Sequence, residues 1–385
     1  MKPFDKKLMN FLYELTKLDK YYSDNELANK ILLEGSKRVT SKTIRSWFRV
    51  LDKGCFDYYP YPQYEKFGLQ LYILFADADE HVLINKIPYQ YYVAKWYSFR
   101  DLKEVLVLAY LIPTGFEKEF GDLVKKEHAL DNLRWYQLYK AGIPLALYNE
   151  FHRCINRDGS GKLHKPKNLE EQLSLLKHHY QHLPRPVLAD IIKKNPFIIP
   201  VVFEYSRDHW HSKQVWKALQ RKFGKETWTY VQKRKSQQEG LGLKRVQDTM
   251  KNLNTSNLFV QMRPVYSALE QANMFYFSIC SFSNIDELIQ LIRELLPLCI
   301  FIYIFPISEN RAALQLVING NFLGKAAVIF EQHVFLEQLL FLNFEKSFAL
   351  WKRDIFKFKD YYHFNPFTKA WENFPIKGKR KKVCI

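Results

Sequence analysis

The chain has 385 residues, of which 47% are apolar, and its 58 lysines and arginines exceed its 40 aspartates and glutamates, so the formal net charge is +18. This length and apolar share predict more than one folded domain and exclude a disordered chain. Glycine is scarce, at 14 residues, and the sequence contains no phosphate-binding loop and no dinucleotide-binding glycine motif. So large a positive charge indicates a polyanionic partner, which is either a nucleic acid or an acidic membrane surface.

Hydropathy and cysteine content indicate in which compartment the protein is expected. No apolar run reaches the roughly 18 residues that cross a bilayer, and the N-terminal segment lacks the features of a signal peptide. The cysteines are widely spaced and form no Cys-x-x-Cys pair, which is typical of a cytoplasmic protein with neither a zinc site nor a disulfide framework. They are Cys55, Cys154, Cys280, Cys299 and Cys384. We therefore expect a cytoplasmic protein with no metal, no cofactor and no membrane partner.

The N-terminal segment predicts three short helices. Residues 4–18 place apolar side chains at helical spacing, which indicates an amphipathic first helix. Ser23 and Glu26 have the spacing of a capping box at the start of a second helix. We expect Thr40 or Ser41 to cap a third helix, because a hydroxyl oxygen there accepts a hydrogen bond from the first helical turn.

The third predicted helix has an apolar face and a basic face. Ile44, Phe48 and Leu51 share the apolar face, and polar or basic residues occupy the other. A recognition helix needs both faces, because one packs on a scaffold while the other enters the major groove of DNA. A solvated basic surface without a partner is the alternative for a single helix of this kind.

Two aromatic-rich stretches, residues 56–61 and 64–67, follow the third helix and are joined by a proline-containing turn. We interpret them as the two strands of a β-wing, with stacking on single-stranded bases as the alternative. Residues 1–66 are therefore predicted to form a winged helix-turn-helix domain. Its predicted DNA-binding residues are Lys37, Arg38, Ser41, Lys42, Thr43, Arg45, Ser46 and Arg49.

Residues 67–150 predict a ferredoxin-like α+β domain. The expected order is strand, helix, strand, strand, helix, strand, although residues 78–88 predict either a short helix or a plain connection. The strands are expected at residues 67–75, 91–97, 102–112 and 133–139, and the second helix at residues 116–129.

A winged helix that leads directly into such a domain resembles the Lrp/AsnC (feast/famine) transcription regulators. Residues 8–54 resemble the DNA-binding half of that family, and residues 68–139 resemble its regulatory half. The resemblance implies a sequence-specific regulator that binds double-stranded DNA, takes a small-molecule effector at its ferredoxin-like domains and forms a homodimer. We therefore expect a nucleoid-associated DNA-binding protein and not an enzyme.

A second, diverged copy of both domains is predicted about 200 residues further along the chain. Residues 42–51 and 244–253 place lysine, branched apolar, basic and leucine residues in the same register. Chance agreement among common residue types is the alternative. The second winged helix is predicted over residues 196–268, with DNA contacts from Lys233, Arg234, Lys244, Arg245, Gln247 and Lys251. The second ferredoxin-like domain is predicted over residues 269–360, with strands at 274–279, 299–305, 312–318 and 339–344 and helices at 285–295 and 322–335.

The remaining segments are interpreted as connections. Residues 151–195 predict a flexible loop and a linker helix at residues 169–182, which Asn168 is expected to cap. Residues 361–385 predict a basic tail that adds non-specific affinity for phosphates. If both recognition helices bind one face of B-DNA, their separation should be about 34 Å or a multiple of it.

Two alternatives of other classes remain open. His209 and His211 flank a tryptophan in the pattern of metal-dependent nickases, and Tyr230 would be the nucleophile of such an enzyme. A non-specific, chromatin-like DNA binder is the other alternative. A third histidine group, His178, His179 and His182, lacks nearby carboxylates or cysteines and is not expected to bind a metal.

Overall fold

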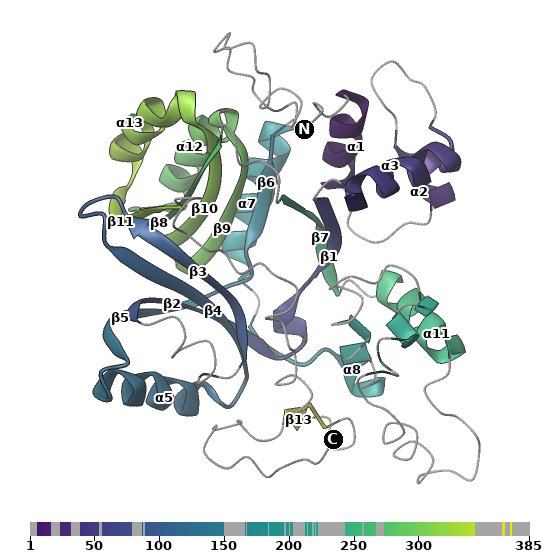
Figure 1. The fold of residues 1–385 in the computed structure, drawn as a ribbon, viewed down its shortest axis with the longest axis horizontal. Helices are drawn as coiled ribbons and strands as arrows, with labels where there is room; N and C mark the ends of the chain where they lie inside the picture. Colours follow the sequence, from purple (N-terminus) through teal and green to yellow (C-terminus); the bar gives the residue numbers. More distant parts are fainter. Residues whose placement is uncertain are drawn as a thin grey trace.

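The computed structural model describes an α+β protein in which two helical regions lie on one side of a β-sandwich (Figure 1). The residues that the structure describes are 6–16, 24–31, 39–53, 56–78, 87, 89–149, 166, 168–183, 185–195, 198–199, 201–202, 212–213, 215–217, 219, 221, 243–255, 258–266, 273–342, 364–365 and 370–371. Within them, no helix is long and apolar enough to cross a membrane.

Three helices form the N-terminal head, as the apolar spacing predicts. They are α1 (Lys6–Thr16), α2 (Asp24–Lys30) and α3 (Ser41–Lys53). Phe11 of α1 is fully buried, and its ring centroid lies 4.8 Å from that of Trp47 and 5.5 Å from that of Phe48, both on α3. Leu27 and Ile44 are buried as well, so each of the three helices contributes to one small core.

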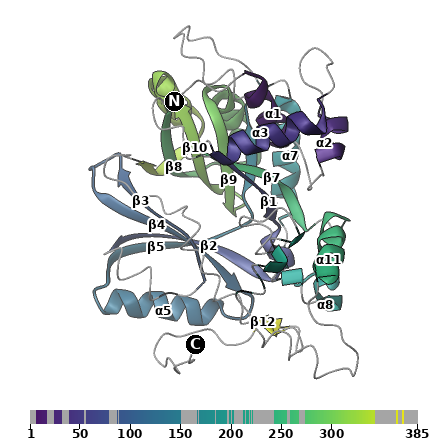
Figure 2. The ribbon, with the colours of Figure 1, turned by 45° about the vertical axis from the view of Figure 1, so that its right-hand side comes forward.

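The predicted β-wing is wrong. The strand β1 (Phe56–Pro62) pairs antiparallel with β7 (Phe259–Tyr266), and the segment after it forms the 3₁₀ helix η1 (Tyr64–Lys66). The sequence pattern marks β1 as a strand but carries no information on its partner, which lies about 200 residues away and satisfies the backbone groups of β1. The ribbon β1–β7 lies between the N-terminal head and helix α11 (Leu243–Thr255) in both ribbon views (Figures 1 and 2).

The sandwich has two halves with the same order of strands. The first half contains β2 (Leu69–Ala78), β3 (Gln90–Ser98), β4 (Glu104–Pro113), α5 (Glu117–Ala129) and β5 (Leu133–Ala141). The second half contains β8 (Asn273–Ser281), α12 (Ile285–Leu295), η2 (Leu296–Leu298), β9 (Cys299–Ser308), β10 (Arg311–Asn319), η3 (Gly320–Phe322), α13 (Leu323–His333) and β11 (Phe335–Phe341). The spatial orders are β5-β2-β4-β3 and β11-β8-β10-β9, and every neighbouring pair is antiparallel.

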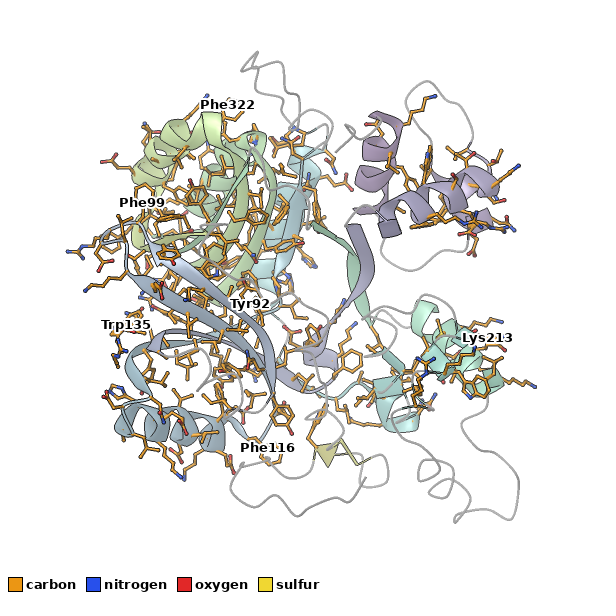
Figure 3. The ribbon with its side chains drawn as sticks, viewed as in Figure 1. Tyr92, Phe99, Phe116, Trp135, Lys213 and Phe322 are labelled. Atoms are coloured by element: carbon orange, nitrogen blue, oxygen red, sulfur yellow. The ribbon has the colours of Figure 1, made fainter. Side chains whose placement is uncertain are left out.

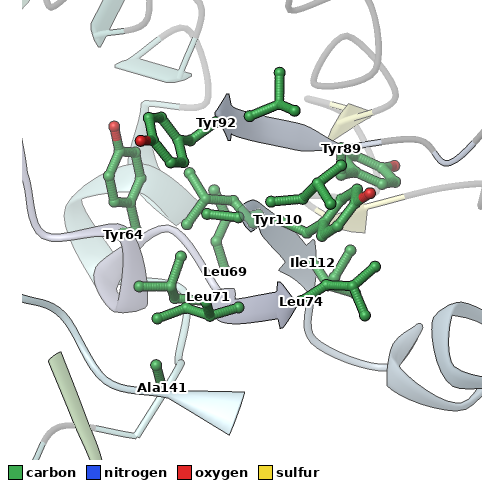
Figure 4. Close-up of a cluster of buried hydrophobic side chains, with 14 of the residues drawn as sticks. Tyr64, Leu69, Leu71, Leu74, Tyr89, Tyr92, Tyr110, Ile112 and Ala141 are labelled. Atoms are coloured by element: carbon green, nitrogen blue, oxygen red, sulfur yellow. The ribbon is translucent and has the colours of Figure 1, made fainter. Parts of the chain in front are cut away.

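The two halves face each other, and side chains alternate between two apolar layers as strand geometry requires. Phe277 of β8 lies in the inner layer, where its ring centroid is 5.5 Å from that of Phe75 and 5.8 Å from that of Trp96. Tyr276 and Cys280 of the same strand point to the opposite side, into the layer beneath α12 and α13. Figure 4 shows part of the buried core of the first half. Tyr110 and Leu74 are fully buried there, on the face of the sheet toward α5, where the ring centroid of Tyr110 lies 5.1 Å from that of Phe120.

Contacts at both edges join the halves. β3 pairs with β11 through Ser98–Leu340 and Tyr97–Phe341, and β5 contacts β9 on the other side. The Gln338 amide of β11 donates to Gln137 Oε1 of β5 over 2.7 Å. The predicted element order is complete in the second half, whereas residues 79–86 of the first half, where a helix or connection was expected, lie outside the described residues.

The segment interpreted as a linker contributes to the sandwich. Its neighbour β6 (Leu145–Tyr148) pairs with β9 and extends the sheet to nine strands, and α7 (Leu169–Gln181) packs beside α12. Ion pairs of 3.1 Å between Lys177 and Asp286 and of 2.9 Å between Arg293 and Glu170 join the two helices. Asn168 does not cap α7, because its Oδ1 instead accepts a hydrogen bond from Gln172 Nε2 over 3.0 Å.

Two further expectations about boundaries need correction. The strand expected from residue 339 begins at Phe335. Its first residues have an apolar spacing that also fits a helix, but their pairing with β8 makes them part of the sheet. Part of the expected tail is ordered as β12 (Phe364–Asn365) and β13 (Ala370–Trp371), and Trp371 Nε1 donates to the Phe67 carbonyl over 2.9 Å. The basic run at residues 377–382 lies outside the described residues.

Candidate nucleic-acid interface

The start of α3 is fixed by a hydroxyl cap. Thr40 Oγ1 accepts a hydrogen bond from the Thr43 amide over 3.2 Å, and the hydroxyls of the same two residues lie 2.9 Å apart. Of the two predicted caps, Thr40 is therefore the one that caps the helix, and Ser41 is its first residue. The cap holds the first turn of α3 in a defined direction at the surface of the head.

One face of α3 is basic and exposed. Lys42, Arg45, Ser46 and Arg49 are exposed and follow the i, i+3, i+4, i+7 spacing of a single helical face. Ile44, on the opposite face, is fully buried. We call these four exposed residues the α3 stripe; it meets the steric and electrostatic demands on a helix that enters the major groove.

An ion pair orients the central arginine of the α3 stripe. Arg45 Nε donates to Asp24 Oδ2 over 2.7 Å, and the side chain of Arg45 is 61% exposed while that of Asp24 is 27% exposed. Asp24 is the first residue of α2, so the pair links α2 to α3. An exposed pair of this kind contributes at most about 1 kcal/mol to stability, but it restricts where the guanidinium points.

Helix α11 presents a second stripe with the same spacing. Lys244, Gln247, Asp248 and Lys251 are exposed, and we call these residues the α11 stripe. Its opposite face packs toward α8 (Asp190–Lys194), where Asn195 Nδ2 lies 3.4 Å from Thr249 Oγ1. Val246 and Met250 complete this apolar face and are buried.

The structure describes nine of the predicted DNA-binding side chains. Ser41, Lys42, Thr43, Arg45, Ser46 and Arg49 lie together on α3, and Lys244, Gln247 and Lys251 lie together on α11. Thr43 is half-buried and hydrogen-bonded to Thr40, the cap of α3, so it lies at the edge of the α3 stripe. Arg245 lies in α11, but its side chain is outside the described residues, as are Lys37, Arg38, Lys233 and Arg234.

The sequence interpretation missed Asp24 and Asp248. The spacing of α11 contained the signal for Asp248, because it follows Lys244 by four residues on the same face. Asp24 carried no such signal, since its partner is 21 residues away and on another helix. The nickase residues His209, His211 and Tyr230 lie outside the described residues.

Two members of the remaining histidine group, on and next to α7, lie within hydrogen-bond distance of backbone carbonyl oxygens. His179 Nε2 lies 2.9 Å from the Ile143 carbonyl oxygen, and His182 Nδ1 lies 3.1 Å from that of His178. No three histidine, cysteine or carboxylate side chains among the described residues are grouped to hold a metal ion.

A buried carboxyl lies where the N-terminal head joins the sandwich. Glu65 of η1 is 5% exposed, and its Oε1 accepts a hydrogen bond from the Ile143 amide over 2.7 Å. Burial raises the pKa of Glu65 to about 7, because the charged form loses its water shell. This group lies apart from both stripes and concerns the stability of the junction.

These elements define an α+β protein in which a three-helix N-terminal head and a second helical region are attached to a two-half antiparallel sandwich. No protein-family model and no curated protein matches the chain. Among solved structures, the chain is similar to the siroheme decarboxylase NirDL, with 12% identity and a TM-score of 0.44 over 87% of this chain and 90% of that chain. The same enzyme in complex with an iron-uroporphyrin III analogue gives 14% identity and a TM-score of 0.42 over 88% of this chain and 90% of that chain.

This finding corrects one expectation. Both similar structures are those of an enzyme, which contradicts the expectation that this chain is not an enzyme, and that expectation is withdrawn. The likeness is confined to the course of the chain, so no reaction, ligand or residue role is carried over from it. The resemblance to the Lrp/AsnC regulators stays a prediction from the sequence.

Proposed function

We propose that the chain is a sequence-specific DNA-binding transcription regulator that uses α3 as its main recognition helix. The observation that carries this proposal is the α3 stripe, in which three of four exposed residues are cationic while the opposite face is buried in the head. Lys42 and Arg49 would neutralise phosphates, and Arg45 would read a base edge in the major groove. The overall charge of +18 supports a polyanionic partner.

We propose further that α11 is a second, weaker DNA-binding helix. Support comes from its equal spacing of exposed residues and from the repeated strand order of the two halves, which is expected of an internal duplication. Both helical regions lie on the same side of the sandwich, whereas Phe99 and Trp135 lie on the other side (Figure 3). One DNA duplex would then contact two unlike half-sites.

Selection of bound duplexes from a random DNA pool tests this function. The expected result is enrichment of an imperfect palindrome or of two unlike half-sites. For each phosphate contact, the logarithm of the binding constant should fall by about 0.9 when the salt concentration rises tenfold. Salt-sensitive binding without enrichment would instead identify a non-specific coating protein. Absence of binding to any duplex at low salt would remove the proposed function altogether.

The small-molecule effector implied by the family resemblance is part of the same proposal. A hollow of about 580 Å³ lies in the second half of the sandwich, between the end of α7, the start of α12 and the β9–β10 turn. Its lining includes Tyr180, Asn284, Ser308 and Asn310. A metabolite that raises the melting temperature of the full chain, and loses this effect in Asn310→Trp, would locate the effector here. The homodimer is tested by light scattering of the full chain.

A further inference from the structure

We propose that Asp24 is a positioning residue that commits Arg45 to reading guanine instead of gripping a phosphate. This inference rests on the proposed DNA-binding function and names the base class that the α3 stripe recognises.

Asp24 engages the inner nitrogen of the guanidinium. The 2.7 Å hydrogen bond joins Arg45 Nε to Asp24 Oδ2. The two terminal nitrogens of an arginine form the edge that matches O6 and N7 of guanine, the commonest specific contact in the major groove. A carboxylate that binds Nε leaves this edge in place and fixes the plane of the group, because the guanidinium is rigid and planar.

The neighbouring cations of the α3 stripe are arranged differently. Lys42 and Arg49 have no carboxylate partner within the part of the chain that the structure describes, so their full charge faces outward. The carboxylate beside Arg45 offsets much of that residue's attraction for a phosphate. In the α3 stripe, the central cation forms an ion pair with a carboxylate and the flanking cations form none with the described residues. We expect this pattern when phosphate contacts position the helix and a central arginine reads a base.

The pair is also accessible enough to act on DNA. Arg45 is 61% exposed and Asp24 only 27%, so the guanidinium projects further than the carboxylate that holds it. Holding a flexible arginine in one orientation before binding reduces the entropy lost when the contact forms. Asp24 would therefore strengthen the guanine contact through Arg45 without touching the DNA itself.

The test uses the full chain and the duplex selected from the random pool. Each guanine is replaced in turn by 7-deazaguanine, which lacks the N7 acceptor, and affinities are measured by fluorescence anisotropy. For the wild type we expect one guanine whose replacement weakens binding about tenfold, and we expect no effect of that replacement in Arg45→Ala. In Asp24→Ala, the ratio of the affinities for the unmodified duplex and for the duplex with 7-deazaguanine should fall to about threefold or less. The salt dependence of binding should stay unchanged.

Two further variants separate positioning from a general effect. Asp24→Asn keeps an acceptor oxygen at the same place and should retain more of the discrimination than Asp24→Ala. Asp190→Ala removes an exposed aspartate that pairs with Lys193 over 3.0 Å on α8, and it should leave the discrimination unchanged. Melting temperatures of all variants report whether the head is folded.

The possible outcomes are distinct. If Asp24→Ala binds all duplexes more tightly and keeps its discrimination, Asp24 only competes with DNA for Arg45, and the inference is wrong. If only the melting temperature changes, the pair is structural, and the inference is again wrong. Selected, salt-sensitive binding in which no guanine depends on Arg45 overturns the inference but leaves the proposed function standing, whereas absence of any DNA binding overturns both.

Discussion

The α3 and α11 stripes have the same spacing but different charge. Lys42, Arg45, Ser46 and Arg49 of α3 correspond in order to Lys244, Gln247, Asp248 and Lys251 of α11. The first set carries three positive charges, and the second carries two positive charges and one negative charge. Because phosphate affinity depends on the number of neutralised phosphates, two stripes with the same spacing but different charge are expected to share DNA binding unequally.

The largest expected effect comes from removing the cations of each stripe in turn. Replacing Lys42, Arg45 and Arg49 by alanine should weaken binding to the selected duplex about a hundredfold or more, and should reduce the salt slope by about two, because Lys42 and Arg49 are the proposed phosphate contacts. Replacing Lys244 and Lys251 by alanine should weaken it only about tenfold. Equal losses, measured by anisotropy at several salt concentrations, would contradict the unequal sharing.

A second prediction concerns the junction behind the N-terminal head. Because burial raises the pKa of Glu65 from 4.5 to about 7, the folded state binds the proton more tightly than the unfolded state, and stability falls as pH rises from 4.5 through 7. Glu65→Gln imitates the protonated form and should stabilise the chain by up to about 3 kcal/mol above pH 7, with little gain below pH 4.5.

Denaturant melts at pH 4.5 and pH 8 check this prediction, and DNA binding provides its control. The variant should discriminate among duplexes as the wild type does, because Glu65 lies apart from both stripes. A gain in stability that is the same at both pH values would show that Glu65 is not buried as described.

A third prediction compares helix caps. Thr40→Ala removes the cap of α3 and should cost about 1 kcal/mol, together with a severalfold loss of DNA affinity. Asn284 is the matched control, because its Oδ1 accepts from the Asp286 and Glu287 amides over 2.9 and 3.2 Å and caps α12 of the sandwich. Asn284→Ala should cost similar stability in thermal melts and leave DNA affinity unchanged when no metabolite is added, because Asn284 also lines the proposed effector hollow. Loss of affinity in both variants would indicate a general effect of instability.

The smallest effect is expected from exchanging a single charge between the stripes. Asp248→Ser should strengthen binding about two- to fivefold, because it removes a carboxylate from a surface that is proposed to face phosphates. Ser46→Asp, the reverse change on α3, should weaken binding by a larger factor. If Asp248→Ser weakens binding instead, Asp248 contacts a base directly, and the amino group of cytosine is the donor that a carboxylate accepts from.

Local features of the head and sandwich were predictable from the sequence. The faces of α3 followed from apolar spacing, and the strands of both halves followed from runs of branched and aromatic residues, except that β11 begins four residues before its expected start. The partner of β1 was not predictable, because a single strand pattern does not encode which distant strand it meets. Asn168 failed as a cap for a local reason, since Gln172, one turn later, donates a hydrogen bond to its side chain.

The pairings that matter most for the site also required the structure. Arg45 was recognisable as a candidate from its place on the basic face, but Asp24 becomes its partner only when α2 and α3 pack together. The raised pKa of Glu65 likewise follows from burial at the junction of η1 and the sandwich, and no local pattern marks it. Contacts between segments far apart in the sequence therefore account for most of what the sequence interpretation missed.

Site-specific photocross-linking from α3 tests the central claim most directly. A benzophenone amino acid replaces Ser46, and a matched variant carries it at Lys118, an exposed residue of α5 on the sandwich. The account predicts cross-links from position 46 to bases at one place in the major groove of the selected duplex, and none from position 118. Cross-links of equal yield from both positions, or none from position 46 while the duplex is bound, would contradict it.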